Sequence, residues 1–205
     1  DTRMTLWRGK DPLILASQSR ARQVLLANAG IHFEAVPADI DERAVQQSSG
    51  LLAPGEIAAL LAREKALSVS MRQPGKYVVG ADQTLALETR LFSKPSGRAA
   101  AAEQLRDLAG RSHQLHSAVA VARDGKILFE TTAIARMTMR QLSGAEIRTY
   151  LDEAGEAVTS SVGAYQLEGL GVHLFERIDG DHFTILGLPL LPLLAFLRSE
   201  RLLGA

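Results

Sequence analysis

The sequence contains no cysteine, and this absence excludes several kinds of chemistry. Without thiols the chain can form no disulfide, no cysteine nucleophile and no cysteine-ligated zinc site, which fits a reducing compartment. An excess of charge of one sign is also lacking, because 23 lysines and arginines balance 23 aspartates and glutamates. A net charge of zero gives no reason to expect a nucleic-acid polymer or a membrane surface as partner. Any basic site must therefore be local.

Long hydrophobic runs are missing too, since no stretch approaches the roughly 18 apolar residues needed to cross a bilayer. The N-terminus also lacks the apolar core of a signal peptide. We therefore expect a cytoplasmic protein with no membrane partner. A chain of 205 residues can bury a full core unaided. We expect an N-terminal extension over residues 1–11 and a single domain with two lobes over residues 12–205.

Strand and helix signals alternate along the chain, which is typical of the α/β class. Asp124-Gly125 between two longer strand-like runs predicts a hairpin, so the sheet should be mixed rather than purely parallel. A polar loop is expected around Gln46–Gly50. The expected strands include residues 12–16, 77–81 and 172–178, and the expected helices begin at Pro54, near Ser96, at the capping box of Ser143 and Glu146, and after Pro189.

The first candidate site follows the predicted strand at residues 12–16. Here the chain breaks into Ser17, Ser19, Arg20 and Arg22 at the start of a predicted helix. Unpaired N–H groups and the helix dipole attract phosphate to such a position, and hydroxyls and guanidiniums add further donors. The alternative is that Ser19 merely caps the helix while the arginines are solvated.

A carboxylate and two lysines form the second candidate group. Asp82 follows a predicted buried strand, where α/β sheets usually place their ligand sites, and could hold a divalent cation or act as a base. It could equally cap a turn. Lys65 lies on a helical face, and Pro95 holds Lys94 in an extended backbone. The two lysines and the first loop supply enough positive charge for a triphosphate, although most lysines are simply solvated.

These residues belong to segments that resemble the Maf family of nucleoside triphosphate pyrophosphatases. The resemblance runs from about Leu13 to Arg198 through LILASQSRARQVLL, VVGADQ, FSKP, SHQLHSAVAV, VGAYQLEGLGVHLFERIDGD and LGLP, in the family's order. It implies an elongated, Maf/Ham1-like (inosine triphosphatase-like) α/β fold, with two lobes around a mixed sheet and a central cleft, and a possible homodimer. It also implies hydrolysis of a nucleoside triphosphate to the monophosphate and pyrophosphate with Mg²⁺ or Mn²⁺.

The resemblance assigns roles residue by residue. Asp82 matches the proton acceptor, and Asp82 with Glu34 could hold the metal. The loop's usual proline and second arginine are replaced by Arg20 and Gln23, so we expect Arg20 to supply the charge that Gln23 lacks. His113 and His116 are interpreted as packing or surface residues. The implied phosphate-binding residues are Ser17, Ser19, Arg20, Arg22, Lys65 and Lys94.

Substrate choice in the family depends on three positions, here Ala21, Gln83 and Glu168. Gln83 and Glu168 match the subgroup that acts on 7-methyl-GTP, and a carboxylate suits the donors and the positive charge of a methylated guanine. Ala21 lacks the aromatic face of that subgroup and matches neither pattern. Two alternatives stay open: a dTTP/UTP-type pyrophosphatase, and a nucleotide-binding regulator of septum formation with little catalysis. The implied role is to keep non-standard nucleotides from being incorporated, with a possible link to cell-division arrest.

Overall fold

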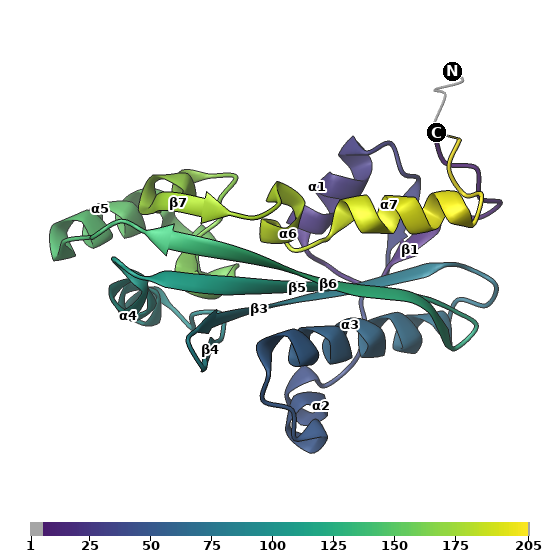
Figure 1. Cartoon of the computed structure of the whole chain (residues 1–205), viewed down its shortest axis with the longest axis horizontal. Helices are drawn as coiled ribbons and strands as arrows, with labels where there is room; N and C mark the ends of the chain where they lie inside the picture. The colour runs from purple at the N-terminus through teal and green to yellow at the C-terminus, as the bar shows by residue number, and fades with distance from the viewer. Residues whose placement is uncertain (1–5, 205) are drawn as a thin grey trace. The chain divides into compact units, whose positions relative to one another are not determined.

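The computed structural model of this chain describes residues 6–204 (Figure 1). Residues 1–5 of the predicted extension, and residue 205, lie outside this range. The described strands are β1 (Leu13–Leu15), β2 (Phe33–Ala35), β3 (Val78–Leu87), β4 (Arg90–Phe92), β5 (Ser112–Arg123), β6 (Lys126–Met139) and β7 (Phe175–Asp179). The described helices are α1 (Arg20–Asn28), α2 (Glu42–Ser49), α3 (Pro54–Ser70), α4 (Arg98–Leu108), α5 (Gly144–Ala154), α6 (His182–Ile185) and α7 (Leu190–Ser199).

One mixed sheet connects these elements, which confirms the predicted α/β class. Its strand order is β2-β1-β3-β5-β6-β7, and β4 pairs with β3. Strand β1 pairs in parallel with β2 and with β3, whereas the β3–β4 and β6–β7 pairs are antiparallel. The predicted hairpin joins β5 to β6, and its two turn residues, Asp124 and Gly125, both have positive φ.

The chain divides into two compact units. The first comprises the described residues up to Gln83, Ser117–Ala133, and the residues from Gly187 onward; the second comprises Thr84–His116 and Ile134–Leu186. Strands β3, β5 and β6 contribute residues to both. No helix within residues 6–204 combines the length and the apolar character that crossing a membrane requires.

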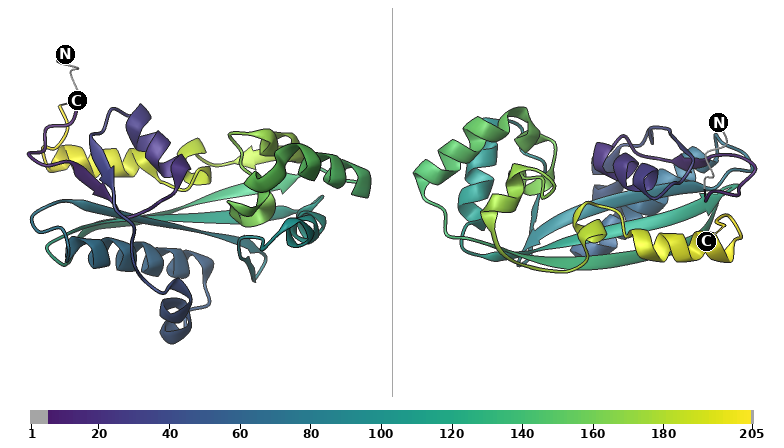
Figure 2. Two further views of the ribbon diagram at one scale, coloured as in Figure 1. Left: turned by 180° about the vertical axis from the view of Figure 1, so that it is seen from behind. Right: turned by 90° about the horizontal axis from the view of Figure 1, so that it is seen from above.

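In the first unit, helices cover both faces of the strands. Figures 1 and 2 show α3 on one face and α7 on the other. Small side chains let α3 approach closely, since its buried alanines pack on alanines of β5. On the other face, the rings of Phe129 and Phe196 stack at 5.0 Å between centroids, which fixes α7 against β6. This close packing determines where side chains of α3 reach the sheet.

Three elements differ from the sequence-based expectation. The strand expected to end before Asp82 continues to Leu87, because β4 pairs with its second half at Leu85–Leu87. The polar loop expected around Gln46–Gly50 lies largely in α2, which Asp41 caps by accepting a hydrogen bond from the backbone of Ala44. The strand expected from residue 172 begins at Phe175, since residues 170–174 form a 3-10 turn.

The second unit contains a deeply buried histidine, His113. His113 is 1% exposed, and its Nε2 lies 2.7 Å from the hydroxyl of Tyr165. Its Nδ1 has no hydrogen-bond partner among the described residues. Burial lowers the pKa of His113 to about 4 from 6.5. His113 and His116, which is also buried, are thus packing residues, one of the two roles expected from the sequence.

Because burial lowers the pKa of His113, we expect the free energy of unfolding to depend on pH. The folded chain keeps His113 neutral down to about pH 4, whereas the unfolded chain takes up a proton near pH 6.5. The free energy of unfolding is therefore not reduced by His113 above pH 6.5. It falls as the pH drops from 6.5 toward 4, by up to about 3 kcal/mol, because only the unfolded chain takes up the proton there. Urea unfolding should show a smaller loss between pH 7 and pH 5 for His113→Gln than for the wild type. His32→Gln, at an exposed position, is the control; equal pH dependence of all three proteins would contradict the prediction.

Candidate active site

The loop after β1 is folded by its own serines. The hydroxyl of Ser19 accepts a hydrogen bond from the backbone N–H of Arg22 at 3.3 Å and so caps α1. The backbone N–H of Ser19 donates to the hydroxyl of Ser17 at 3.1 Å. Ser19 therefore caps the helix, which is the alternative role that the sequence left open for it. Ser17 is buried, whereas Arg20, at the first position of α1, is exposed.

Arg22 is held from two sides. Its Nε donates to the carbonyl oxygen of Gly187 at 2.8 Å, and its Nη1 donates to the hydroxyl of Ser17 at 3.4 Å. Burial lowers the pKa of Arg22, and the negative charges of Asp82 and then Glu42 act in the opposite direction. The loop thus presents one half-buried guanidinium to the same region as two carboxylates.

Lys65 connects those two carboxylates. Its Nζ lies 3.0 Å from Oδ1 of Asp82 and 2.7 Å from Oε1 of Glu42. The side chains of Lys65 and Asp82 are only 14% and 13% exposed. Burial raises the pKa of Asp82, and the positive charges of Lys65 and Arg22 offset part of that rise. Asp82 is consequently a desolvated carboxylate between two cations.

Local packing brings Lys65 and Asp82 together. A side chain at Gly80 of β3 would collide with the backbone of Ala62 and Ala66 in α3, so glycine permits the close contact of helix and strand. Lys65 lies one residue before Ala66, and Asp82 lies two residues after Gly80 on the same β3 face. The close approach at Gly80 therefore sets the separation of the lysine and the carboxylate.

Glu42 was not among the residues predicted from the sequence. The sequence prediction selected Glu34, which is exposed on β2 opposite Ile14 and forms no ion pair within residues 6–204. Glu42 is the first residue of α2, and the packing of α2 on α3 carries it to Lys65. The available signal was Asp41-Glu42 itself, a capping residue followed by an acidic residue in a first helical turn.

The predicted specificity residues belong to different units. In the first unit, Ala21 is half-buried in α1, and Nε2 of Gln83 donates to the hydroxyl of Ser117 at 3.0 Å. In the second unit, Glu168 is exposed in a turn, and Lys94, a predicted phosphate ligand, is exposed between β4 and α4. The roles assigned to Ala21, Gln83, Lys94 and Glu168 all stay predictions.

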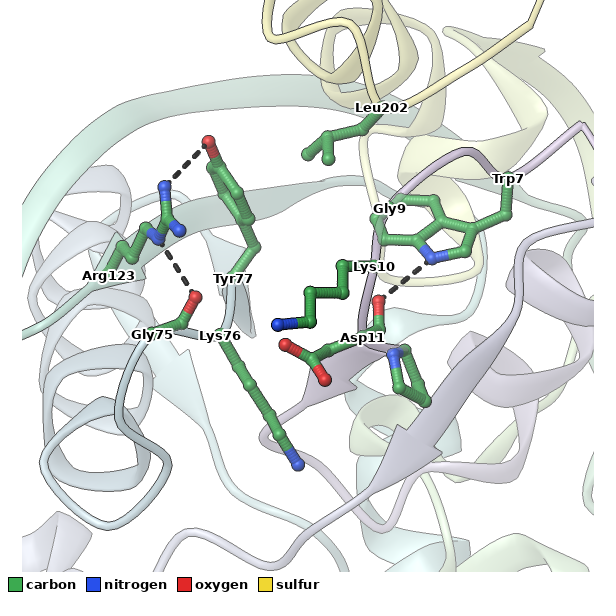
Figure 3. Close-up of a pocket in the computed structure, with 10 residues that line it drawn as sticks. Trp7, Gly9, Lys10, Asp11, Gly75, Lys76, Tyr77, Arg123 and Leu202 are labelled. Atoms are coloured by element: carbon green, nitrogen blue, oxygen red, sulfur yellow. Dashed lines mark hydrogen bonds between the residues drawn. The ribbon is translucent and has the colours of Figure 1, made fainter.

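A hollow of about 240 Å³ in the first unit lies away from this cluster (Figure 3). It lies where β1 and β3 begin, next to Pro12 and Tyr77, whereas Ser17 follows β1 and Asp82 is further along β3. Three hydrogen bonds link groups of its lining: the Trp7 indole donates to the Asp11 carbonyl, and Arg123 donates to the Gly75 carbonyl and the Tyr77 hydroxyl. We interpret this hollow as a product of how the chain ends pack.

Comparison with known proteins places the chain in a family. A nucleoside triphosphate pyrophosphatase of Bradyrhizobium diazoefficiens is 71% identical to this chain, over 98% of it and 100% of the relative. A 7-methyl-GTP pyrophosphatase of Brucella abortus is 53% identical, over 92% of this chain and 96% of the relative. Among solved structures, a HAM1 protein from Coxiella burnetii has a TM-score of 0.41 and 17% identity, over 62% of this chain and 72% of that chain. The model of the Maf family, described as Maf-like protein, matches residues 12–200, and the chain therefore belongs to this family.

Proposed function

We propose that this chain is a nucleoside triphosphate pyrophosphatase, which hydrolyses its substrate to the monophosphate and pyrophosphate. The observation that carries the proposal is the contact of Lys65 with both Asp82 and Glu42, near the half-buried Arg22. Fixed cations of this kind stabilise the charge that develops on a phosphate chain. The similarity to relatives that bear this enzyme name supports the same activity.

A divalent metal, Mg²⁺ or Mn²⁺, fits this donor set as a further part of the proposal. Asp82 and Glu42 converge on one atom, Nζ of Lys65. Within residues 6–204, no group of three or more histidine, cysteine, aspartate or glutamate side chains could form a cage made of protein alone. Mg²⁺ commonly binds one or two carboxylates together with substrate phosphates, so Asp82 and Glu42 are the residues we assign to it. Bound there, it would supply charge compensation for the phosphate oxygens.

The chain's own residues account for the remaining chemistry. Asp82 accepts the proton of the water that attacks the α-phosphorus, and the bond to the leaving pyrophosphate breaks as the new P–O bond forms. Its desolvated carboxylate suits this role, because burial raises its pKa and thus its basicity. Arg22 and Lys65 hold the phosphate chain, and the Ser17 hydroxyl orients Arg22. The roles of Lys94 and Arg20 as further phosphate ligands are part of the proposal.

For the base, we propose 7-methyl-GTP as the preferred substrate. Gln83 and Glu168 match that subgroup, and the Brucella abortus relative bears the name of that activity. Ala21 departs from the subgroup and leaves a smaller side chain at its position. We also propose that the protein is a homodimer, which light scattering tests, and that it is cytoplasmic, which cell fractionation tests. Its proposed role is to remove non-standard nucleotides.

A substrate panel tests the reaction and the base preference together. Pyrophosphate release should be measured with GTP, 7-methyl-GTP, UTP, dTTP and 5-methyl-UTP, with Mg²⁺, with Mn²⁺ and with EDTA. We expect metal-dependent release that is fastest with 7-methyl-GTP. Preference for a pyrimidine would contradict the assignment of Gln83 and Glu168 but retain the reaction. Binding of nucleotide, seen as a thermal shift, without any release would instead favour the regulator of septum formation.

A further inference from the structure

A backbone carbonyl oxygen, and not a carboxylate, holds the guanidinium of Arg22 in place. Within residues 6–204 its guanidinium forms no direct ion pair, and its shortest hydrogen bond is the 2.8 Å contact of Nε with the carbonyl oxygen of Gly187. That carbonyl fixes the direction of the side chain while leaving its positive charge uncompensated by direct contact. An arginine with a purely structural role would more commonly pair with a carboxylate when half-buried.

Gly187 is itself held rigidly. Residues 187–190 are all buried, Pro189 directly precedes α7, and the stacking of Phe196 on Phe129 fixes that helix in the first unit. Gly187 has φ of +102°, a conformation that L side chains rarely adopt. A Cβ at this position would lie 3.2 Å from Nη2 and 3.3 Å from Nε of Arg22. A side chain at Gly187 would therefore press on the guanidinium as well as strain the backbone.

We infer that Gly187 is a positioning residue for Arg22: its carbonyl oxygen aims the guanidinium at the phosphate chain, and its lack of a side chain leaves room for that orientation. The inference rests on the proposed function, which supplies the phosphate ligand. It links the segment before α7 to the phosphate-binding loop, although the two residues are 165 positions apart in the sequence. A displacement of the guanidinium by a fraction of an ångström would weaken contacts to the transition state.

The Gly187→Ala variant tests the inference, with Gly30→Ala as its matched control. Gly30 also has a positive φ, +73°, and belongs to the first unit, but a Cβ there meets nothing within 4 Å. Both variants carry backbone strain, and only Gly187→Ala disturbs Arg22. We expect Gly187→Ala to lower kcat/KM for pyrophosphate release by about ten- to hundredfold and Gly30→Ala to leave it within about twofold. Equal kinetics of the two variants would overturn the inference.

A double-mutant cycle separates positioning from general destabilisation. Arg22→Lys keeps the charge but lacks the Nε–H that Gly187 accepts. If Gly187 acts through Arg22, Gly187→Ala should cause no further loss in the Arg22→Lys background. Multiplicative losses would show that Gly187 acts independently and would refute the positioning role. Thermal unfolding of each variant confirms that the assayed protein is folded.

Calorimetric binding of inorganic pyrophosphate keeps this test separate from the test of catalysis. If the wild type releases no pyrophosphate from any triphosphate, the proposed function fails, but Gly187→Ala should still weaken pyrophosphate binding at least about tenfold relative to Gly30→Ala. Equal binding by the two variants, or no binding by the wild type, would contradict the assignment of Arg22 as a phosphate ligand aimed by Gly187.

Discussion

The Asp82→Asn variant is expected to release pyrophosphate at least about a hundredfold more slowly than the wild type, because the amide cannot accept the proton of the attacking water. The substitution preserves shape and leaves Lys65 paired with Glu42. The loss of the Lys65 contact and the relief of burying a charge oppose each other, so we expect the variant to stay folded with little change in stability. Measurement of kcat at saturating substrate and metal isolates the chemical effect.

A control variant and a binding measurement distinguish a loss of catalysis from a loss of structure in Asp82→Asn. Asp39→Asn, at an exposed position of the first unit, removes one carboxylate of the same charge and should retain wild-type turnover. Binding of pyrophosphate should persist in Asp82→Asn, since Arg22 and Lys65 remain. Wild-type turnover of purified Asp82→Asn would remove Asp82 from the mechanism, and loss of both turnover and the folded state would assign it a structural role instead.

Local signals in this sequence predicted local structure correctly. The hairpin at Asp124-Gly125 follows from the positive φ that its turn requires, and the Ser143–Glu146 capping box forms with both of its hydrogen bonds. Each of these features depends on residues within four positions of one another. The predicted helix start at Pro54 is confirmed for the same reason, because proline suits the first helical turn.

Contacts between distant segments could not be predicted in this way. Strand β3 continues through Asp82 because β4 pairs with its second half, and this pairing has no signal at Asp82 itself. Glu42 reaches Lys65 because α2 packs on α3. Gly187 meets Arg22 only in the folded chain. Resemblance to a family identified single residues, whereas the ion pairs among them depend on tertiary packing.

The Lys65→Met variant is expected to lose both stability and activity. It leaves the buried carboxylate of Asp82 without its direct partner and facing Glu42, and breaking one side of such a buried pair costs about 3 kcal/mol. It also removes a charge that stabilises the developing negative charge on phosphate, so kcat/KM should fall at least about a hundredfold. Urea unfolding and pyrophosphate release measure the two effects, and Lys126→Met, at an exposed position, is the control for losing one lysine.

The double variant Lys65→Met with Asp82→Asn separates the two causes. A neutral amide needs no counter-charge, so the double variant should be more stable than Lys65→Met alone although it remains inactive. The pH dependence should agree: without Lys65 the pKa of Asp82 rises further above its unfolded value, since Lys65 normally lowers it. The folded variant then binds more protons than the unfolded chain, and its stability deficit should shrink as pH falls. If the double variant is no more stable than Lys65→Met, the lysine does not stabilise the fold through Asp82, and its effect on activity must be independent of that ion pair.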